Sequence, residues 1–257
     1  PGKYGKDDAG GFRNVLPPGQ NGLDTFSDYL KFQSQGKLPK HWADQQPLYE
    51  DLMYASPTLT PDQVDNYFKD ATFGVKKSQR ASTVKPRKGV TIIRDKAYGV
   101  PHIYGETRSD TMFGAGYASA ADRLFLMDVL RHTGRADLSN FLGGKNVQAD
   151  ANQWQFAPYT EDDLKRQLQK PDHVKTKVWK KLRNDIDAYV AGINKYIDAA
   201  KKNPKMMPAE YVGIGKTIKA WRKTDVIATA SLFGGIFGRG GGAEVTSGLV
   251  FRALEQR

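Results

Sequence analysis

The sequence contains no cysteine, which excludes disulfide bonds and thiolate metal sites. Histidine is scarce as well, and none of the histidines has a partner at metal-ligand spacing; the four are His41, His102, His132 and His173. No Gly-x-Ser-x-Gly elbow marks a nucleophile at a strand-to-helix turn. We therefore expect no histidine metal site. A Ser-His-Asp site stays open, but nothing in the residues points to one.

Long apolar runs and leader patterns are also absent. The longest charge-free apolar stretch, residues 226–238, is shorter than the roughly 20 residues that span a bilayer, so we expect no transmembrane segment. The chain starts at Pro1 without the charged and apolar pattern of a signal peptide, and we expect that a segment upstream was removed or left out. The lack of cysteine is compatible with a secreted protein.

Acidic residues are outnumbered, 28 Asp and Glu against 39 Lys and Arg, for a formal net charge of +11. This balance favours an anionic partner such as nucleic acid, an anionic surface or an acidic chain. The lysines of residues 175–183 alternate with apolar positions and have no aromatic platform beside them, so a solvated helix face is the better interpretation. The glycine-rich run 238–242 lacks a preceding strand and a following Lys-Ser/Thr, which favours a break between helices over a phosphate cradle.

The chain divides into two parts by composition. Residues 1–85 are rich in Gly, Pro and charge at their start, and we expect an N-terminal extension that wraps the core. Within it, residues 23–35 have helical apolar spacing, and Thr60 followed by Pro61 is typical of a helix start. Residues 86–257 are predicted to form the core, and the 39% of hydrophobic residues in the chain are enough to build one.

Strand and helix patterns alternate in the first half of the core. Residues 89–95 read as a buried strand, and residues 100–106 as a second strand whose Pro101 favours a sheet edge or a bulge. Residues 109–134 predict a helix with apolar side chains in every direction, hence a buried one. Asp128 and Arg131, three residues apart, are spaced to pair on it.

The second half of the core is predicted to be helical. Apolar residues recur at three or four over residues 178–197, a loop is expected at 203–215, and Thr224 or Asp225 is placed to cap an apolar helix that the glycines at 234 and 235 break. A last helix is expected from Glu244 to the end of the chain.

Residues 90–131 resemble the start of the penicillin acylase family of N-terminal-nucleophile hydrolases. The family pattern is a strand ending in Arg-Asp, then Gly-hydrophobic-Pro-His-Ile, Gly-Tyr and Asp-Arg-Leu-Phe-x-Met, and here these are Arg94-Asp95, Gly99–Ile103, Gly116-Tyr117 and Asp122–Met127. Segments similar to the family follow in order: GRADLSNFLG, DAYVAGINKYI and MPAEYVGIGKTIKAWRKTDVIA. The resemblance covers roughly residues 88–257.

The resemblance implies the fold, the partner and the chemistry. It implies an α+β class, in which this chain is the mostly helical small-chain portion of an αββα hydrolase and contributes a few strands. The family's precursor cuts itself into two chains, and the larger (beta) chain begins with a serine, threonine or cysteine that attacks an amide carbonyl. This sequence matches only the smaller (alpha) chain, so we expect no catalytic residue in it and a structural role for His102.

The resemblance also assigns site residues. The helix after the Trp-Asp segment bends over the acyl pocket in the family, which makes Phe233, Ile236, Phe237 and Arg239 the expected substrate contacts. Glu244 matches the glutamate through which the small chain reaches a structural calcium ion held otherwise by the larger chain. No organic cofactor is implied. From the residue alone, Glu244 is a carboxylate favoured by a helix dipole.

Three functions follow from this reading. The first is the small chain of a secreted, self-processed amidohydrolase that acts on a small-molecule amide such as a penicillin, an acyl-homoserine lactone or a lipopeptide. The second is a non-catalytic relative that serves as an envelope or assembly component. The third, nucleic-acid binding, has the least support and would show strongly salt-dependent affinity.

Overall fold

The computed structural model describes residues 26–37, 51–52, 54–67, 74–238 and 244–256. It divides into two compact units, the first comprising Pro1–Met127 with Lys177–Trp221 and the second Asp128–Thr176 with Arg222–Arg257. Helices dominate and one small sheet accompanies them, which confirms the α+β class. Most of the segment predicted to wrap the core lies outside the described residues, so that part of the domain division stays a prediction.

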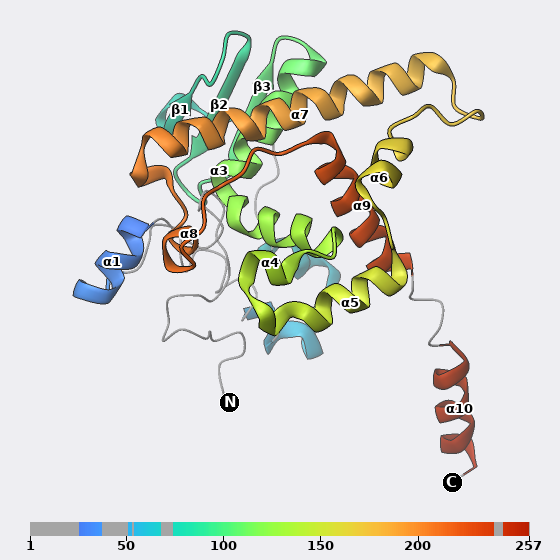
Figure 1. Cartoon of the computed structure of the whole chain (residues 1–257). Coiled ribbons are helices and arrows are strands. Elements are labelled where there is room, and N and C mark those ends of the chain that lie inside the picture. The colour runs from blue at the N-terminus through green and yellow to red at the C-terminus, as the bar shows by residue number, and fades with distance from the viewer. Residues whose placement is uncertain (1–25, 38–50, 53, 68–73, 239–243, 257) are drawn as a thin grey trace. The chain divides into compact units, whose positions relative to one another are not determined.

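The first unit contains a three-stranded antiparallel sheet in the order β1-β2-β3 (Figure 1). The central strand β2, Val90–Asp95, buries Val90, Ile92 and Ile93, as its β-branched composition predicts. Strand β3, Pro101–Gly105, pairs only with β2 in this sheet, so the edge position that proline favours is confirmed. Strand β1, Arg80–Val84, was not predicted, because all five of its residues are exposed and show no apolar alternation.

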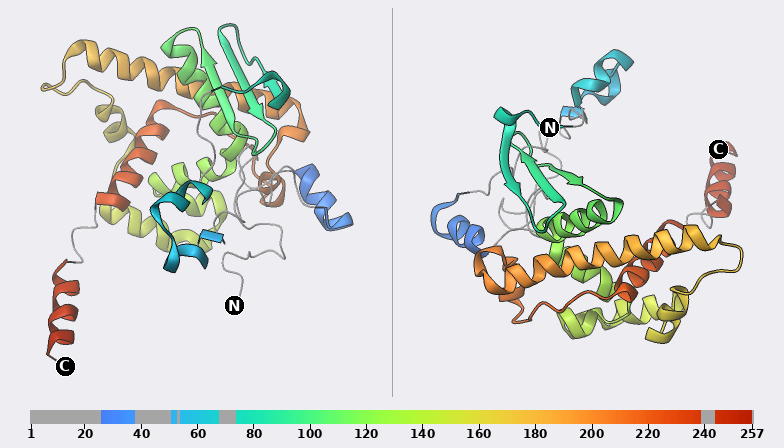
Figure 2. Two further views of the ribbon diagram at one scale, coloured as in Figure 1. Left: turned by 180° about the vertical axis from the view of Figure 1, so that it is seen from behind. Right: turned by 90° about the horizontal axis from the view of Figure 1, so that it is seen from above.

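Helix α3, Arg108–Gly134, packs between the sheet and helix α7, Thr176–Lys202 (Figure 2). Glycines let the two helices approach closely. A methyl group on Gly116 would overlap the carbonyl oxygen of Tyr189 in α7, and one on Gly192 would overlap that of Phe113 in α3. The packed layer holds apolar residues from all three elements: Val90, Ile92, Phe113, Ala118 and Ala188.

Two arginine–carboxylate pairs connect these elements. Arg94 of β2 donates two hydrogen bonds to Asp122 of α3, at 2.6 and 3.3 Å, which explains why the family pattern holds both residues. Arg108 of α3 donates to Asp185 of α7 at 2.6 Å, and this hydrogen bond holds the pKa of the Asp185 carboxyl below its usual value. These pairs fix the sheet and α7 to opposite sides of α3.

The turn between β2 and β3 accounts for the rest of the opening motif. Asp95 accepts a hydrogen bond from the backbone N–H of Tyr98 at 2.6 Å, and Gly99 has φ of 71°, a left-handed conformation that favours glycine. His102 on β3 lies 3.6 Å from the Asp95 carboxylate. The motif therefore shapes a turn, and the structural role expected for His102 stays a prediction.

The remaining predicted elements of the first unit differ in detail. Helix α1, Phe26–Gln35, confirms the helix predicted there. The helix start at residue 60 proves to be a 3-10 segment, η3, Pro61–Tyr67. The predicted loop at 203–215 contains two short helices, η6 (Pro204–Met206) and α8 (Ala209–Gly213). Two further 3-10 turns are η2, Ser56–Thr58, and η4, Lys77–Gln79.

The second unit is built from helices, and no strand occurs among its described residues. After the end of α3 come α4 (Leu138–Leu142), η5 (Gly144–Asn146), α5 (Val147–Phe156) and α6 (Glu161–Gln167). Helices α9 (Lys223–Gly238) and α10 (Glu244–Glu255) complete it. Among all described residues, no helix is both long and apolar enough to cross a membrane.

Candidate functional site

Helix α9 carries most of the predicted site, and a buried ion network holds its first turn. Asp225, whose side chain is only 3% exposed, accepts a hydrogen bond from Arg135 at 2.5 Å and one from Arg131 at 3.3 Å. Its second oxygen also accepts the backbone N–H of Arg222 at 2.7 Å, which caps the helix. Arg131 lies in the last turn of α3 and Arg135 directly follows the helix, so the network fastens α9 to the end of α3.

Further carboxylates complete the network. Asp128 lies 3.0 Å from Arg131, which confirms the pair predicted from their spacing. Glu161 of α6 accepts from Arg135 at 2.7 Å and from the Thr224 hydroxyl at 2.9 Å. Burial alone would raise the pKa of the Glu161 carboxyl, but these two hydrogen bonds outweigh it and hold the pKa below its usual value. The network therefore joins the ends of α3, α6 and α9.

His132 lies next to this network without entering it. Its ring stacks on Phe141 with centroids 4.4 Å apart, and its Nδ1 lies 3.1 Å from the Asp137 carboxylate. Burial lowers the pKa of the imidazole, the charge of Arg131 lowers it further, and the contact with Asp137 only partly offsets this. The residue packs as a largely neutral aromatic ring.

Beyond its first turn, α9 packs closely on α3. A methyl group on Gly134 of α3 would overlap the carbonyl of Ala228, and Ala228 and Leu232 are buried. The helix then continues through Gly234 and Gly235 to Gly238, so the predicted break at this glycine pair is wrong. Each of the two glycines lowers helix stability by roughly 0.5–1 kcal/mol, but the packing of the preceding turns on α3 outweighs this loss.

The predicted substrate contacts lie at the free end of α9. Phe233, Ile236 and Phe237 are 40%, 55% and 79% exposed, unusually high values for large apolar side chains. The rings of Phe233 and Phe237 stack with centroids 6.4 Å apart and planes 11° apart. Arg239 lies outside the described residues. The structure thus brings three of the four predicted contacts together as one apolar surface.

Glu244, the predicted calcium ligand, is the first residue of α10. The described residues contain no group of three or more His, Asp or Glu side chains that could hold a metal ion. A calcium ion takes six to eight oxygens, so one carboxylate here would supply only a small part of such a shell. The side chain of Glu244 itself lies outside the described residues, so its role as a calcium ligand stays a prediction.

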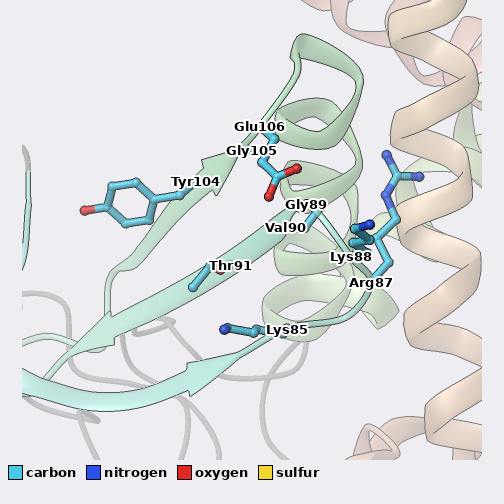
Figure 3. Close-up of a pocket in the computed structure, with 9 residues that line it drawn as sticks. All are labelled: Lys85, Arg87, Lys88, Gly89, Val90, Thr91, Tyr104, Gly105 and Glu106. Atoms are coloured by element: carbon cyan, nitrogen blue, oxygen red, sulfur yellow. The ribbon is translucent and has the colours of Figure 1, made fainter.

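A basic cavity of about 610 Å³ lies on the sheet of the first unit. Figure 3 shows its residues on β2, on β3 and on the turn before β2; they are Lys85, Arg87, Lys88, Gly89, Val90, Thr91, Tyr104, Gly105 and Glu106. The Arg87 guanidinium donates to Asp110 at 2.7 Å and lies 4.0 Å over the Phe113 ring. Its charge is therefore engaged in packing at the start of α3.

Comparison with known proteins places these features in a family. The penicillin amidase family model matches residues 89–255. The chain belongs to the penicillin amidase family. The resemblance seen in the opening motif and in the three later segments is thereby confirmed.

The two curated relatives are much longer than the matched region, which spans less than a fifth of each. Penicillin G acylase of Escherichia coli is 30% identical over 141 residues, which are 53% of this chain and 15% of that protein. Penicillin acylase 2 proenzyme of Pseudomonas sp. (strain SE83) is 25% identical over 149 residues, 58% of this chain and 17% of that protein. A solved structure of a thermostable penicillin G acylase from Alcaligenes faecalis matches with a TM-score of 0.50 and 26% identity, covering 68% of this chain and 84% of that chain.

Two features of this penicillin amidase family chain escaped sequence reasoning. The ion network joins Arg135 to Asp225 across 90 residues of sequence, and only its local pair, Asp128 with Arg131, had a visible spacing. A cleft between α5 and α9 is lined in part by Gln153, a residue type with no pattern to mark it. The sequence held one indication of the network: Asp225 had already been singled out as a candidate helix cap.

Proposed function

We propose that this chain is the small chain of a two-chain amidohydrolase of the penicillin amidase family. The observation that carries the proposal is the difference in coverage. The chain spans 84% of the solved Alcaligenes faecalis chain but only 15–17% of the curated sequences. A region that is nearly a whole chain in one relative and a small fraction of others is expected if a long precursor is cut. The printed name "proenzyme" of one relative supports the same view.

Exposed apolar side chains support a large partner. Val178 and Leu182 at the start of α7 are exposed, although their spacing continues the buried stripe of that helix. Helix α10 exposes five large apolar side chains: Val245, Leu249, Val250, Phe251 and Leu254. Monomeric proteins rarely leave such patches open, and a core-like interface with a larger chain would cover them.

The chemistry of the proposed enzyme divides between the chains. The partner's N-terminal serine, threonine or cysteine attacks the amide carbonyl, with its own free amine taking the proton of the hydroxyl or thiol. The amine product leaves with that proton, and water then hydrolyses the acyl-enzyme to the free acid. This chain holds the acyl group against Phe233, Ile236 and Phe237, and Arg239, two residues after Phe237, is the fourth proposed contact. These contacts select the acyl group and take no part in proton transfer.

The proposal also includes a structural calcium ion and a place of action outside the cytoplasm. Glu244 would supply one carboxylate oxygen to a structural calcium ion whose other ligands come from the larger chain, tying the two chains together after cleavage. The absence of cysteine suits a protein that works outside the cytoplasm, in the periplasm, the cell envelope or the medium.

One experiment tests the central proposal. Mass spectrometry of the purified protein should show a second, larger chain that begins with Ser, Thr or Cys, and the mixture should hydrolyse an amide panel. A larger chain with another first residue and no hydrolysis would favour the non-catalytic relative. A single, stable chain of this sequence with a cooperative melt would overturn the two-chain proposal altogether.

The acyl contacts are tested by specificity. Replacing Phe233 or Phe237 by alanine should shift preference toward bulkier acyl groups, by about 1–3 kcal/mol in relative kcat/KM per lost contact. Phe251→Ala, an exposed phenylalanine on α10, is the matched control and should keep wild-type ratios. If both α9 variants hydrolyse a panel of acyl lengths in wild-type ratios, the acyl group binds elsewhere.

The calcium ligand is tested by melting with and without chelator. Glu244→Gln should lower the melting temperature of the two-chain protein, and chelator should then lower it little further. Glu255→Gln, at the other end of α10, is the control and should keep the wild-type chelator response. If Glu244→Gln melts within a degree or two of wild type and responds to chelator as wild type does, the carboxylate only complements the helix dipole, worth about 0.3–1 kcal/mol.

A further inference from the structure

The basic cavity on the sheet of the first unit lies partly outside the region that the family model matches. That match begins at residue 89, whereas strand β1 and the turn that carries Lys85 and Lys88 come before it. The volume of about 610 Å³ falls in the range of small-molecule sites, which is commonly about 300–1,000 Å³. The cavity is therefore large enough for a ligand, and its basic wall is a feature that the family match does not account for.

The pleat of the sheet decides which side chains face the cavity. Val90 and Ile103 pack in the apolar layer against α3. Thr91 and Tyr104, which are paired across β2 and β3, alternate with these two residues and so project from the opposite face. Figure 3 shows the side chain of Lys85 extending to the same side. The open face of the sheet thus presents an ammonium group, a hydroxyl group and an aromatic ring together.

The cations of the cavity divide into one that is engaged and two that are not. Arg87 points toward α3, where it donates to Asp110 at 2.7 Å and lies over a phenylalanine ring. Lys85 and Lys88 are exposed and form no ion pair or hydrogen bond with any described residue. Glu106, the acid among the described residues that line the cavity, is paired with neither lysine. Two ammonium groups are therefore available to a ligand.

The surface around the cavity is strongly positive. Within residues 74–106, six cations and one acid are exposed. The acid is Glu106, and the cations are Lys76, Lys77, Arg80, Lys85, Lys88 and Lys96. Such a local excess of one sign raises the concentration of the opposite ions near the surface. The net charge of +11 favours an anionic partner, and this part of the first unit concentrates some of that charge.

We propose that this cavity binds a phosphorylated sugar. A phosphate monoester carries about 1.5 to 2 negative charges at neutral pH, which match the ammonium groups of Lys85 and Lys88. The carboxylate of Glu106 would repel a bare anion, but it accepts hydrogen bonds from hydroxyl groups, so it favours a ligand with hydroxyls beyond its phosphate. The ring of Tyr104, which is 45% exposed, offers a flat apolar surface to the C–H face of a sugar. The proposal goes beyond amide hydrolysis and does not rest on it.

The test is isothermal titration calorimetry in about 0.15 M salt, on the protein purified with every chain that accompanies it. Glucose 6-phosphate should bind saturably. Inorganic phosphate and glucose should each bind more weakly, because each of them makes only part of the contacts. Absence of saturable binding of glucose 6-phosphate, or equal Kd values for glucose 6-phosphate and inorganic phosphate, would overturn the proposal.

Two pairs of lysines separate binding in the cavity from attraction by net charge. Replacing Lys85 and Lys88 together by glutamine should raise the Kd for glucose 6-phosphate by roughly 2- to 25-fold, since two exposed charge contacts are lost. Replacing Lys76 and Lys77 together changes the net charge equally, outside the cavity lining. The five residues of β1, about 17 Å of strand, separate this pair from Lys85, and charges so far apart are screened at this salt concentration. The control should keep the Kd within about 1.5-fold. Equal Kd values for the two double variants would rule out the cavity as the site.

Tyr104→Ala tests the sugar part of the proposal. This variant should raise the Kd for glucose 6-phosphate by roughly 2- to 12-fold and leave that for inorganic phosphate unchanged. Tyr54→Ala, 47% exposed and outside the cavity lining, is the control and should change neither. An unchanged Kd for glucose 6-phosphate in Tyr104→Ala would contradict binding of the sugar. Binding to phosphatidylglycerol vesicles without binding of glucose 6-phosphate would indicate a membrane surface instead and would also overturn the proposal. Glucose 6-phosphate binding with these variant effects supports the cavity whether or not the protein hydrolyses amides.

Discussion

Replacing Asp225 by alanine tests whether the ion network anchors α9. The network holds three carboxylates, those of Asp128, Glu161 and Asp225, against the guanidinium groups of Arg131, Arg135 and Arg222. Removal of Asp225 leaves one positive charge in excess. It also removes the acceptor of the backbone N–H that begins the helix. The predicted effect is a large loss of stability from the removal of one carboxylate.

The size of the stability loss depends on which carboxylate each arginine still contacts after Asp225 is removed. Breaking a buried ion pair by removing one partner costs roughly 3–5 kcal/mol, because the other charge stays desolvated. Here Arg131 keeps Asp128 at 3.0 Å and Arg135 keeps Glu161 at 2.7 Å, which places the loss near the lower figure. At about 2–4 °C per kcal/mol for a domain of 150–250 residues, a loss of about 3 kcal/mol lowers the melting temperature by about 6–12 °C.

The assay is thermal unfolding of the intact protein, with a matched aspartate as control. Asp162 is 78% exposed and, among the described residues, pairs with Lys165 alone at 3.1 Å, so Asp162→Ala should cost less than about 1 kcal/mol. Asp225→Asn keeps acceptor oxygen and should melt between the two alanine variants. If Asp225→Ala melts within 2 °C of Asp162→Ala, the network contributes nothing measurable and the anchoring argument is wrong.

Three further predictions concern the packing and the titrating groups. Gly116→Ala should lower the free energy of unfolding in urea by about 1–3 kcal/mol, because the added methyl group overlaps a carbonyl of α7. Gly213→Ala, which adds a methyl group in open space, should leave it unchanged. Equal losses for the two variants would contradict the close approach of α3 and α7. Folding lowers the pKa of His132, so below about pH 6.5 the unfolded chain takes up a proton at this residue more readily than the folded chain, and the folded state loses stability. The melting temperature of wild type should therefore fall more between pH 7 and pH 5 than that of His132→Gln. Equal falls in the two melting temperatures would refute this. Because the pKa of Asp185 is also lowered on folding, its contribution is complete above about pH 4 and is lost as pH falls through the folded value, so the melting gap to Asp185→Asn should narrow only below about pH 4.

Local patterns predicted much of the fold. The β-branched run of residues 90–95 and the proline that follows at 101 were enough to predict a buried central strand and an edge strand. The apolar spacing of α7 predicted that helix, since burial of one face sets the spacing, whereas α3 was predicted from apolar residues in every direction. Strand β1 has no such signal, because its exposed residues are held by hydrogen bonds to β2 rather than by burial of their side chains.

Contacts between residues far apart in the sequence limit how much of the candidate site could be predicted. The glycine pair in α9 reads as a break, but packing of Ala228 on α3 and the buried Asp225 keep the helix intact to Gly238. Phe233, Ile236 and Phe237 were selected through the family resemblance, and their common exposed surface follows from that continued helix. The environment of Gln153 depends on two segments about 80 residues apart, so no local pattern could indicate it.

The last turn of α9 extends past the residues that hold the helix. Leu232 is buried, and Phe237 lies five residues further on, about 7.5 Å away at 1.5 Å per residue. A tilt of about 10° at Leu232 therefore moves the end of the helix by about 1.3 Å. Shifts of about 1 Å in a substrate-positioning group can change rates by about 100-fold. On the proposed function, substitutions that loosen the packing of Ala228 or Leu232 should thus alter acyl preference without touching the acyl group.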